Sequence, residues 1–361
     1  MNGFLAGFFA PWVIFAFILV MHLVLPARKV TGYVHDTLTG EPLRYRLNGL
    51  PVMAMTVGLW ALIGYSGLLP WDWLYLHRWS GLTGSCVMGV LFSVAVVLPA
   101  KGTGRKFIVD LYSGRSENIQ FFRGRVDAKM FLYLAGAILL ALNISSFLAH
   151  HLLIFGMGSS QGVLLYSFLF FWFVIDYLIF ERVHLYTYDI FAERVGFKLG
   201  WGSLAFYPYF YMIGLWAAVD LPCPVTAPWL LVISISIFFA GWMLSRGANM
   251  QKFYFKTRPD HAFLGIMKPG VLSDGRHTLL CSGFWKVARH VNYLGEILMA
   301  VGLTLVLGRP ALWAAWLYPL YYIALLFPRE RSDELRCAAK YGGLWTEYVR
   351  RVPRRIIPGI Y

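Results

Sequence analysis

Charged residues are scarce in this sequence. Only 14% of the 361 residues are Asp, Glu, Lys or Arg, whereas 58% are hydrophobic, and the mean hydropathy is +0.60. This balance lies outside the usual range of soluble globular proteins and is typical of membrane proteins. The fold class that it predicts is all-α, as a polytopic integral membrane protein whose helices cross the lipid bilayer.

Cysteine is rare as well, and the four present are dispersed. They form no CxxC motif, and two of them fall in segments that we expect to face the cytoplasm: Cys86, Cys223, Cys281 and Cys337. This pattern implies neither a disulfide framework nor a structural zinc site, so we expect no metal. Internal repeats, low-complexity tracts and long polar linkers are also lacking, which predicts one transmembrane domain over residues 1–361.

Apolar runs of membrane-spanning length occur about nine times, where about 17 to 25 residues are needed to cross the hydrocarbon layer. The first run has no basic region before it, which predicts a retained helix and not a secretory signal. We therefore expect about nine to ten transmembrane helices. The runs are 3–25, 50–69, 80–99, 131–154, 162–180, 204–220, 227–246, 291–308 and 310–328.

The net charge of +14 is concentrated in alternate connections between these runs. Lys and Arg gather after the first, third, fifth, seventh and ninth runs, whereas the other connections hold only Arg78 and Arg309. Cytoplasmic loops collect positive charge, so we expect the N-terminus outside and the C-terminus in the cytoplasm. Because the charges lie in short loops beside the lipid bilayer, we expect contact with anionic lipid and no nucleic-acid partner.

The C-terminal tail predicts a helix with a polar face. Gly342 and Gly343 should end this helix, and 344–351 can form a second one before Pro353. Spacing alone also fits an interfacial helix with a surface ion pair worth about 0.3 to 0.5 kcal/mol. The ionic residues of the first helix are spaced by 4, 3 and 4, which places them on one stripe: Arg329, Asp333, Arg336 and Lys340.

Three stretches carry the most specific signal: NMQKFYFKTRP at 249–259, SGFWKVARHVNYLGE at 282–296, and the tail RERSDELRCAAKYGGLWTEYVRRVPRRIIPGIY at 329–361. Together with a second signature over 176–211, they resemble the sterol reductases that reduce C14, C7 or side-chain C24 double bonds. The resemblance covers roughly residues 110–361, and the preceding residues contribute only hydrophobic helices.

The resemblance implies that an unactivated alkene is protonated and that the resulting carbocation takes a hydride from NADPH, in sterol biosynthesis. It divides the chain into N-terminal helices (1–110), sterol-pocket helices and loops (111–230) and an NADPH-binding half (231–361) with a pocket on the cytoplasmic side. The implied partners are a sterol within the membrane and NADPH from the cytoplasm. A bacterial inner membrane and an endoplasmic reticulum membrane both remain open.

NADPH is polyanionic, and Arg or Lys usually holds its 2′-phosphate. No GxGxxG motif follows a strand, so a Rossmann unit is not expected, and the basic segments 247–290 and 329–355 are the predicted cradle. Lys256 stands where the family has Arg, which keeps the charge but loses the bidentate fork. Without the motif, the Trp and Tyr residues among the cofactor positions would be interpreted as membrane-interface anchors. The cofactor positions carried over from the family are Lys252, Lys256, Leu280, Trp285, Asn292, Tyr293, Asp333, Cys337, Lys340, Tyr341 and Tyr348.

Protonation of the alkene needs an acid beside an apolar pocket, and buried carboxyl or tyrosine groups can serve. We predict Tyr211 as the proton donor or relay, with Asp333 and Arg329 tuning it from the cofactor side and Glu181 as the alternative acid. A purely structural interpretation remains for two of these. Tyr211 belongs to the aromatic run FYPYFY, and Glu181 can cap a helix or pair with Arg182.

Several positions depart from the family pattern. The departures are Ser203 for Asp, Lys286 for Gly, Glu296 for Asp, Pro328 for His and Ser332 for Arg. The Asp replaced by Ser203 and the His replaced by Pro328 lie where chemistry or substrate position can be set, so the reduced bond stays open among C14, C7 and C24. Arg331 or Arg336 can compensate for the Arg that Ser332 replaces.

Two other classes compete with the reductase hypothesis. Membrane methyltransferases of the isoprenylcysteine and phospholipid type, which use S-adenosylmethionine, resemble the same C-terminal region through an RHPxYxG element, but here Val291 follows Arg289 and His290 in place of Pro. A non-catalytic sterol-binding membrane protein or a transporter is the second class. A transporter is disfavoured because the sequence shows no repeated halves with matched Gly or Pro breaks.

Overall fold

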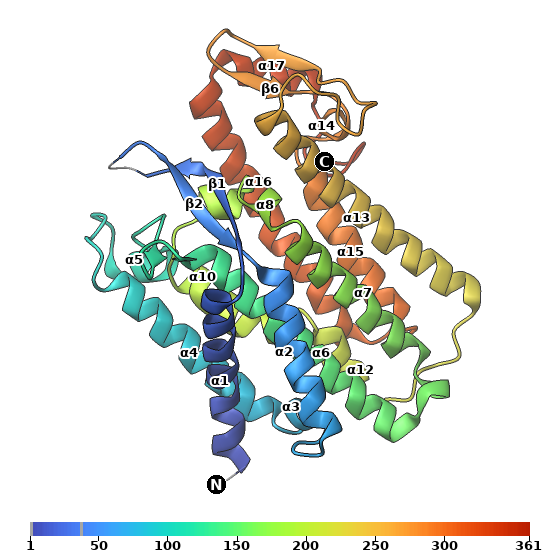
Figure 1. The fold of residues 1–361 in the computed structure, drawn as a ribbon. Helices are drawn as coiled ribbons and strands as arrows, with labels where there is room; N and C mark the ends of the chain where they lie inside the picture. The colour runs from blue at the N-terminus through green and yellow to red at the C-terminus, as the bar shows by residue number, and fades with distance from the viewer. Residues whose placement is uncertain (1–2, 37–38) are drawn as a thin grey trace. The chain divides into compact units, whose positions relative to one another are not determined.

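The computed structural model describes residues 3–36 and 39–361, and Figure 1 shows the chain as a ribbon. Most of the chain is helical. Its internal contacts divide it into two compact units, Met1–Pro224 and Val225–Tyr361, called here the N-terminal and C-terminal units.

Apolar helices form the frame of each unit. Among the residues that the structure describes, two shorter apolar helices, α2 (Gly49–Tyr65) and α15 (Val291–Val306), accompany five that are long and apolar enough to cross a membrane. These seven helices coincide with seven of the nine predicted runs, which supports a multi-pass membrane protein. The five long helices are α1 (Gly3–Val24), α4 (Arg78–Val97), α6 (Ala128–Phe155), α7 (Gln161–Ile179) and α13 (Pro228–Thr257).

The run 204–220 does not form the single helix that we predicted. After α10 (Phe197–Trp201), the chain makes a π-helical turn, η2 (Gly202–Phe206), then α11 (Tyr207–Phe210) and α12 (Ile213–Ala218). Pro208 lacks an N–H and its ring clashes with the carbonyl four residues earlier, which disfavours regular α-helical hydrogen bonding in this segment. Single π turns inside helices often lie at functional sites.

The last apolar run and the tail helix are continuous. The 3₁₀ turn η3 (Trp313–Trp316) leads into α16 (Leu317–Tyr341), which passes through Pro328. The hydroxyl of Ser332 donates to the Pro328 carbonyl at 3.1 Å. The predicted end is confirmed: Gly342 has a φ of +52°, a conformation that favours glycine, and α17 (Gly343–Arg351) follows.

The all-α prediction is wrong in one respect, because the described residues include three two-stranded antiparallel sheets in the polar connections. Their strands are too short or too polar to stand out from loops in the sequence. They pair β1 (Arg28–His35) with β2 (Pro42–Leu47), β3 (Gln120–Phe121) with β4 (Val126–Asp127), and β5 (Val271–Ser273) with β6 (Thr278–Leu280). Short helices complete the connections: α3 (Trp73–Leu76), α5 (Phe107–Ser113), η1 (Met157–Ser159), α8 (Glu181–His184), α9 (Tyr188–Phe191) and α14 (Phe284–Val287).

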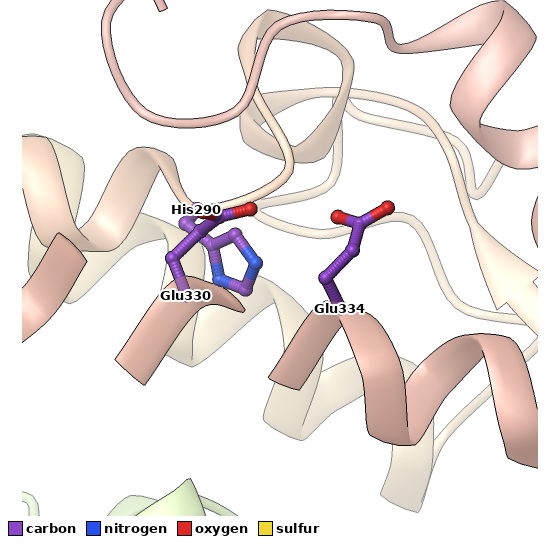
Figure 2. A group of neighbouring side chains, drawn as sticks. All are labelled: His290, Glu330 and Glu334. Atoms are coloured by element: carbon purple, nitrogen blue, oxygen red, sulfur yellow. The ribbon is translucent and has the colours of Figure 1, made fainter. Parts of the chain in front are cut away.

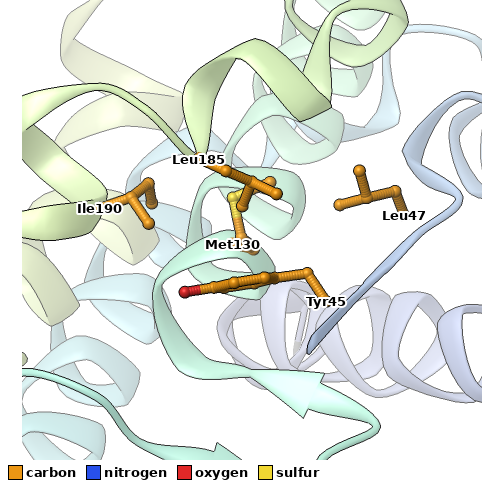
Figure 3. Packing of buried hydrophobic residues seen from close by; sticks show 5 residues of the cluster. All are labelled: Tyr45, Leu47, Met130, Leu185 and Ile190. Carbon is orange, nitrogen blue, oxygen red and sulfur yellow. The ribbon is translucent and has the colours of Figure 1, made fainter. Parts of the chain in front are cut away.

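A buried cluster ties the β1–β2 hairpin to the rest of the N-terminal unit. Tyr45 and Leu47 of β2 pack with Met130 of α6 and with Leu185 and Ile190 near α8 and α9, as Figure 3 shows. All five side chains are buried, so burial of apolar surface stabilises this junction.

Two polar residues beside this cluster have structural tasks. The Asp127 carboxylate accepts a hydrogen bond from the Met130 N–H at 3.1 Å and so caps α6. The buried Lys129 ammonium donates to the carbonyls of Ile190 and Glu193, the latter at 2.9 Å. Its charge therefore lies close to backbone acceptors just after α9, which compensates its burial.

Helices α13 and α15 pack backbone against backbone. A Cβ atom on Gly295 would lie 2.5 Å from both the Gly241 carbonyl oxygen and the Ser245 nitrogen, and one on Gly241 would lie 2.6 Å from the Gly295 carbonyl oxygen. Small residues allow such close packing of membrane helices. The Ser245 hydroxyl then reaches the Glu296 carboxylate at 2.5 Å.

We predict that Gly295→Ala destabilises the protein by about 1 to 3 kcal/mol, because the added methyl group forces α13 and α15 apart. Thermal unfolding in detergent measures the effect. The matched control is Gly58→Ala in α2, where a Cβ meets nothing within 4 Å; it should leave stability unchanged or raise it by up to about 1 kcal/mol. Equal melting temperatures for the two variants would contradict the close-packing account.

Candidate functional site

Tyr211 lies in the N-terminal unit, directly after α11 and within one turn of the π-helical segment. Its ring packs edge-on against Phe206 and Tyr207, with centroids 6.3 and 4.6 Å away. The side chain is half-buried. The predicted proton donor is therefore held in an aromatic setting next to a distorted helical turn, where a hydroxyl can face an apolar reactant.

Glu181 begins α8 and is buried. Its carboxylate accepts a hydrogen bond at 3.1 Å from the N–H of Gly49, the first residue of α2. The helix-capping interpretation of Glu181 is thus confirmed, since a carboxylate is favourable at a helix N-terminus. Burial raises the pKa of Glu181 to about 7, and the Gly49 hydrogen bond opposes this shift.

The Glu181 shift predicts a pH effect on stability. Because the pKa rises from 4.5 to about 7 on folding, the folded state holds the proton more tightly than the unfolded state. The contribution is complete below pH 4.5 and is lost as the pH rises through about 7, to a total of up to about 3 kcal/mol. We expect thermal unfolding to show this loss in the wild type but not in Glu181→Gln, which keeps the acceptor.

The control for this prediction is Glu117→Gln, because Glu117 is an exposed carboxylate of the same unit. It should follow the wild-type pH profile. A Glu181→Gln profile parallel to the wild type between about pH 4.5 and pH 8 would contradict the prediction.

In the C-terminal unit, two of the motif stretches meet through Gln251. Its side-chain amide donates to the Ser282 carbonyl at 3.2 Å, and its oxygen accepts from the Phe284 N–H at 3.0 Å. Gly283, between them, has a φ of +60°, and a Cβ there would lie 2.8 Å from the Gln251 side-chain oxygen. The end of α13 and the start of α14 are therefore joined at a position where only glycine fits well.

Trp285 of α14 is held from two sides. Its indole N–H donates to the Ala248 carbonyl at 3.0 Å, and its own carbonyl lies 3.4 Å from the Tyr348 hydroxyl, which donates to it. The Lys252 ammonium lies 5.7 Å from its ring centroid. With the N–H already bonded, Trp285 offers a ring surface for stacking and not a donor.

The predicted stripe of α16 brings charge to the same region. The carboxylate of Asp333 is half-buried, and burial raises its pKa, while the charges of Lys252, Arg336 and Arg329 oppose the rise. Asp333 thus lies within electrostatic reach of Lys252 on α13, which the sequence alone did not specify.

The aromatic cofactor positions continue from α16 into α17. The Lys340 ammonium lies 5.0 Å from the Tyr341 ring centroid, and Tyr341 stacks with Trp345 at 6.3 Å. Cys337 packs against an apolar cluster that includes Trp345 and Tyr348. Burial raises the pKa of the Cys337 thiol to about 12, so the thiol stays uncharged near neutral pH.

Asn292 and Tyr293 begin α15, and Leu280 ends β6. The Asn292 amide nitrogen donates to the Asn249 side-chain oxygen at 3.4 Å. The Asn292 Oδ1 atom is buried and has no hydrogen-bond partner among residues 3–36 and 39–361. Tyr293 is buried and stacks on His290, with centroids 4.9 Å apart.

These groups suit a polyanionic cofactor. Lys252, Lys256 and Lys340 act on one another electrostatically, and the charge of Asp333 acts on Lys252. A group of three cations attracts phosphate groups. The buried oxygen of Asn292 is an acceptor open to an N–H or O–H donor, so the chemistry of the donor set fits NADPH.

Arg289 was a motif position without an assigned task in the sequence. Its guanidinium is buried and donates to the Glu334 carboxylate at 3.1 Å and to the carbonyls of Val352 and Pro353 at 2.8 and 3.0 Å. Its backbone N–H bonds the Arg354 carbonyl at 3.0 Å. Arg289 therefore holds the tail against α16. Its place in the motif was the only sequence signal, and that signal gave no direction for the side chain.

His290, Glu330 and Glu334 lie close together, as Figure 2 shows, with one nitrogen or oxygen atom of each within 4.8 Å of the others. Burial, with a smaller contribution from the charge of Arg289, lowers the pKa of His290 to about 3. Both carboxylates already have cations, since Arg289 pairs with Glu334 at 3.1 Å and Arg355 with Glu330 at 3.7 Å. The group is charge-balanced without a metal ion.

The chain matches the protein-family model described as "Ergosterol biosynthesis ERG4/ERG24 family" over residues 6–361. The chain belongs to this family. The family is one of sterol reductases, which are NADPH-dependent oxidoreductases of sterol biosynthesis. The match also corrects the predicted extent of the resemblance, because it begins at residue 6 and not near residue 110.

Three relatives are similar over nearly their whole length. The Delta(14)-sterol reductase of Arabidopsis thaliana is 33% identical, covering 96% of this chain and 94% of its own. Delta(14)-sterol reductase TM7SF2 of Mus musculus is 32% identical (98% and 86%), and Delta(14)-sterol reductase ERG24 of Saccharomyces cerevisiae is 31% identical (95% and 81%). Membership of the ERG4/ERG24 family sets aside the methyltransferase and transporter alternatives.

Within this sterol reductase, the predicted site residues fall into two groups. Tyr211 and Glu181 belong to the N-terminal unit. Arg329 and all the predicted cofactor positions, Asp333 included, belong to the C-terminal unit, where contacts and charges link Lys252, Trp285 and Asp333.

Proposed function

We propose that this protein is a membrane-embedded sterol C14 reductase that uses NADPH. The observation that carries the proposal is similarity at 30 to 33% identity, over 89 to 99% of this chain, to six proteins that are each named a Delta(14)-sterol reductase. None of these six names refers to a C7 or a C24 bond. The Ser203 and Pro328 departures are therefore compatible with C14 reduction under this proposal.

NADPH, when bound, supplies the hydride. We assign Lys252, Lys256 and Lys340 to its phosphate groups, because these cations lie within electrostatic reach of one another. Trp285, fixed by its bond to the Ala248 carbonyl, offers its ring for stacking. Asn292 offers its buried oxygen as an acceptor. Leu280, Tyr293, Cys337, Tyr341 and Tyr348 complete the proposed wall.

Tyr211 is the proposed proton donor or relay. Its half-buried side chain packs edge-on against the rings of Phe206 and Tyr207, so the hydroxyl is carried in an apolar, aromatic setting. The carbocation forms when a proton adds to one alkene carbon, and the hydride then adds to the other carbon. Asp333 and Arg329 are proposed to adjust the acidity of Tyr211 from the cofactor side. Glu181 is the weaker candidate for the proton donor, because its carboxylate caps α2.

The proposed arrangement in the cell follows from charge and hydrophobicity. An odd number of membrane crossings, such as nine, with an external N-terminus and a cytoplasmic C-terminus would give NADPH access from the cytoplasm and the sterol access from the bilayer. Either a bacterial inner membrane or the endoplasmic reticulum membrane is compatible with this arrangement.

A direct test uses the purified protein in detergent with NADPH and a panel of sterols that carry a 14-ene, a 7-ene or a 24-ene. We expect saturation of the 14-ene alone, measured by mass spectrometry of the products, and NADPH binding measured by calorimetry. Reduction of only the 7-ene or the 24-ene would reject the C14 assignment. Absence of both binding and turnover would reject the reductase proposal.

A second test concerns the proton. Tyr211→Phe should lower kcat by about a hundredfold or more, in the range of a lost general acid, while NADPH binding stays at the wild-type level. Tyr65→Phe is the control, because Tyr65 is 86% exposed at the end of α2, and it should behave as the wild type. A near-normal kcat for Tyr211→Phe would show that another group donates the proton.

A further inference from the structure

Helix α16 carries two neighbouring polar stripes with different partners. At about 100° per residue, Glu330 and Glu334 share one stripe, and Asp333 and Lys340 share the stripe beside it. The second stripe belongs to the proposed cofactor wall. The first is turned to other groups: Glu330 is fully buried and Glu334 has a side chain only 20% exposed.

The Glu334 carboxylate is bonded at both oxygens. One accepts from the Arg289 guanidinium and the other from the Trp345 indole N–H, each at 3.1 Å. Arg289 precedes α15 and Trp345 lies in α17. Two directional bonds from two different elements therefore restrict the rotation of α16 at this point.

One turn earlier, Glu330 is held in the same manner by the tail. It accepts from the Tyr361 hydroxyl at 3.2 Å and pairs with Arg355 at 3.7 Å. Arg355 also donates to the Tyr361 hydroxyl at 3.1 Å, and Tyr361 stacks on Phe327 of α16 at 5.1 Å. The restriction thus extends over a full turn of the helix.

We propose that these groups form a clamp that sets the rotation of α16 and thereby aims Asp333 and Lys340 at the cofactor. The α16 clamp consists of Arg289, Glu330, Glu334, Trp345, Arg355 and Tyr361. Its members are positioning residues, since each acts through α16 and not on the reacting atoms. The inference rests on the proposed function, because it assigns the clamp to NADPH binding.

The charge on Glu334 is the part of the clamp that is simplest to remove. Glu334→Gln keeps the shape and one oxygen, but its amide NH₂ then faces an N–H donor from either Arg289 or Trp345, so one of the two bonds is lost. Glu347→Gln is the matched control. Glu347 lies on α17 and also bonds two guanidiniums, at 3.0 and 3.1 Å, but these belong to the exposed Arg350 and Arg351.

We expect Glu334→Gln to raise both the NADPH Kd and the NADPH KM by about tenfold or more, because small displacements of charged groups weaken their contacts strongly. The sterol KM, and kcat at saturating NADPH, should stay within about twofold of the wild type. Amide hydrogen exchange over 329–341 should become faster. Glu347→Gln should change none of these, and Lys340→Ala should raise the NADPH KM without faster exchange.

Faster exchange with an unchanged NADPH KM would overturn the proposal, because the clamp would then be structural only. Unchanged exchange and KM would overturn it as well. If Glu334→Gln does not fold, Arg289→Lys replaces it: this variant keeps the charge but lacks the fork that reaches Glu334 and the tail together. A wild type that bound no NADPH would sink the proposed function, and exchange over 329–341 would still decide whether α16 is held by these residues.

Discussion

Helices α13 and α15 meet at glycines, and the placement of the proposed cofactor wall depends on that contact. There is no room for a side chain at Gly241 or Gly295, and the two backbones lie close together at this point. The end of α13, which carries Gln251 and Lys252, is thereby brought to the segment that precedes α15. Once the two are adjacent, Gln251 can bond both sides of Gly283, and Trp285 can reach the Ala248 carbonyl.

The polar groups at this edge of a hydrophobic chain have separate tasks. An unpaired charge is costly when buried, so a buried ionic group is retained only with partners of the right geometry. Arg289 meets this condition with a carboxylate and two carbonyls. The lysines are in a different setting, because Lys252, Lys256 and Lys340 act on one another as like charges. A group of like charges suits a polyanionic ligand.

The N-terminal unit shows the same separation. Glu181, Asp127 and Lys129 are each bonded to backbone groups near the ends of helices, which explains their presence without any contact to substrate. Tyr211 instead follows a π-helical turn and packs among aromatic rings. A distorted turn costs backbone hydrogen-bond geometry, so its position beside the proposed proton donor is consistent with a functional constraint.

The sequence by itself determined the class of protein, the place of seven apolar helices, the end of α16 at Gly342 and, through its motifs, the family. These depend on composition, on the period of the helix and on local backbone preference, all of which are read along the chain. The residues of the cofactor wall stay a prediction from those motifs. Only the tertiary structure decided how 204–220 is divided, that α16 runs through Pro328, and that Arg289 points to Glu334 and the tail while Glu181 caps α2. Each of these depends on the rotation of a helix or on partners distant in sequence, and a local pattern does not contain that information.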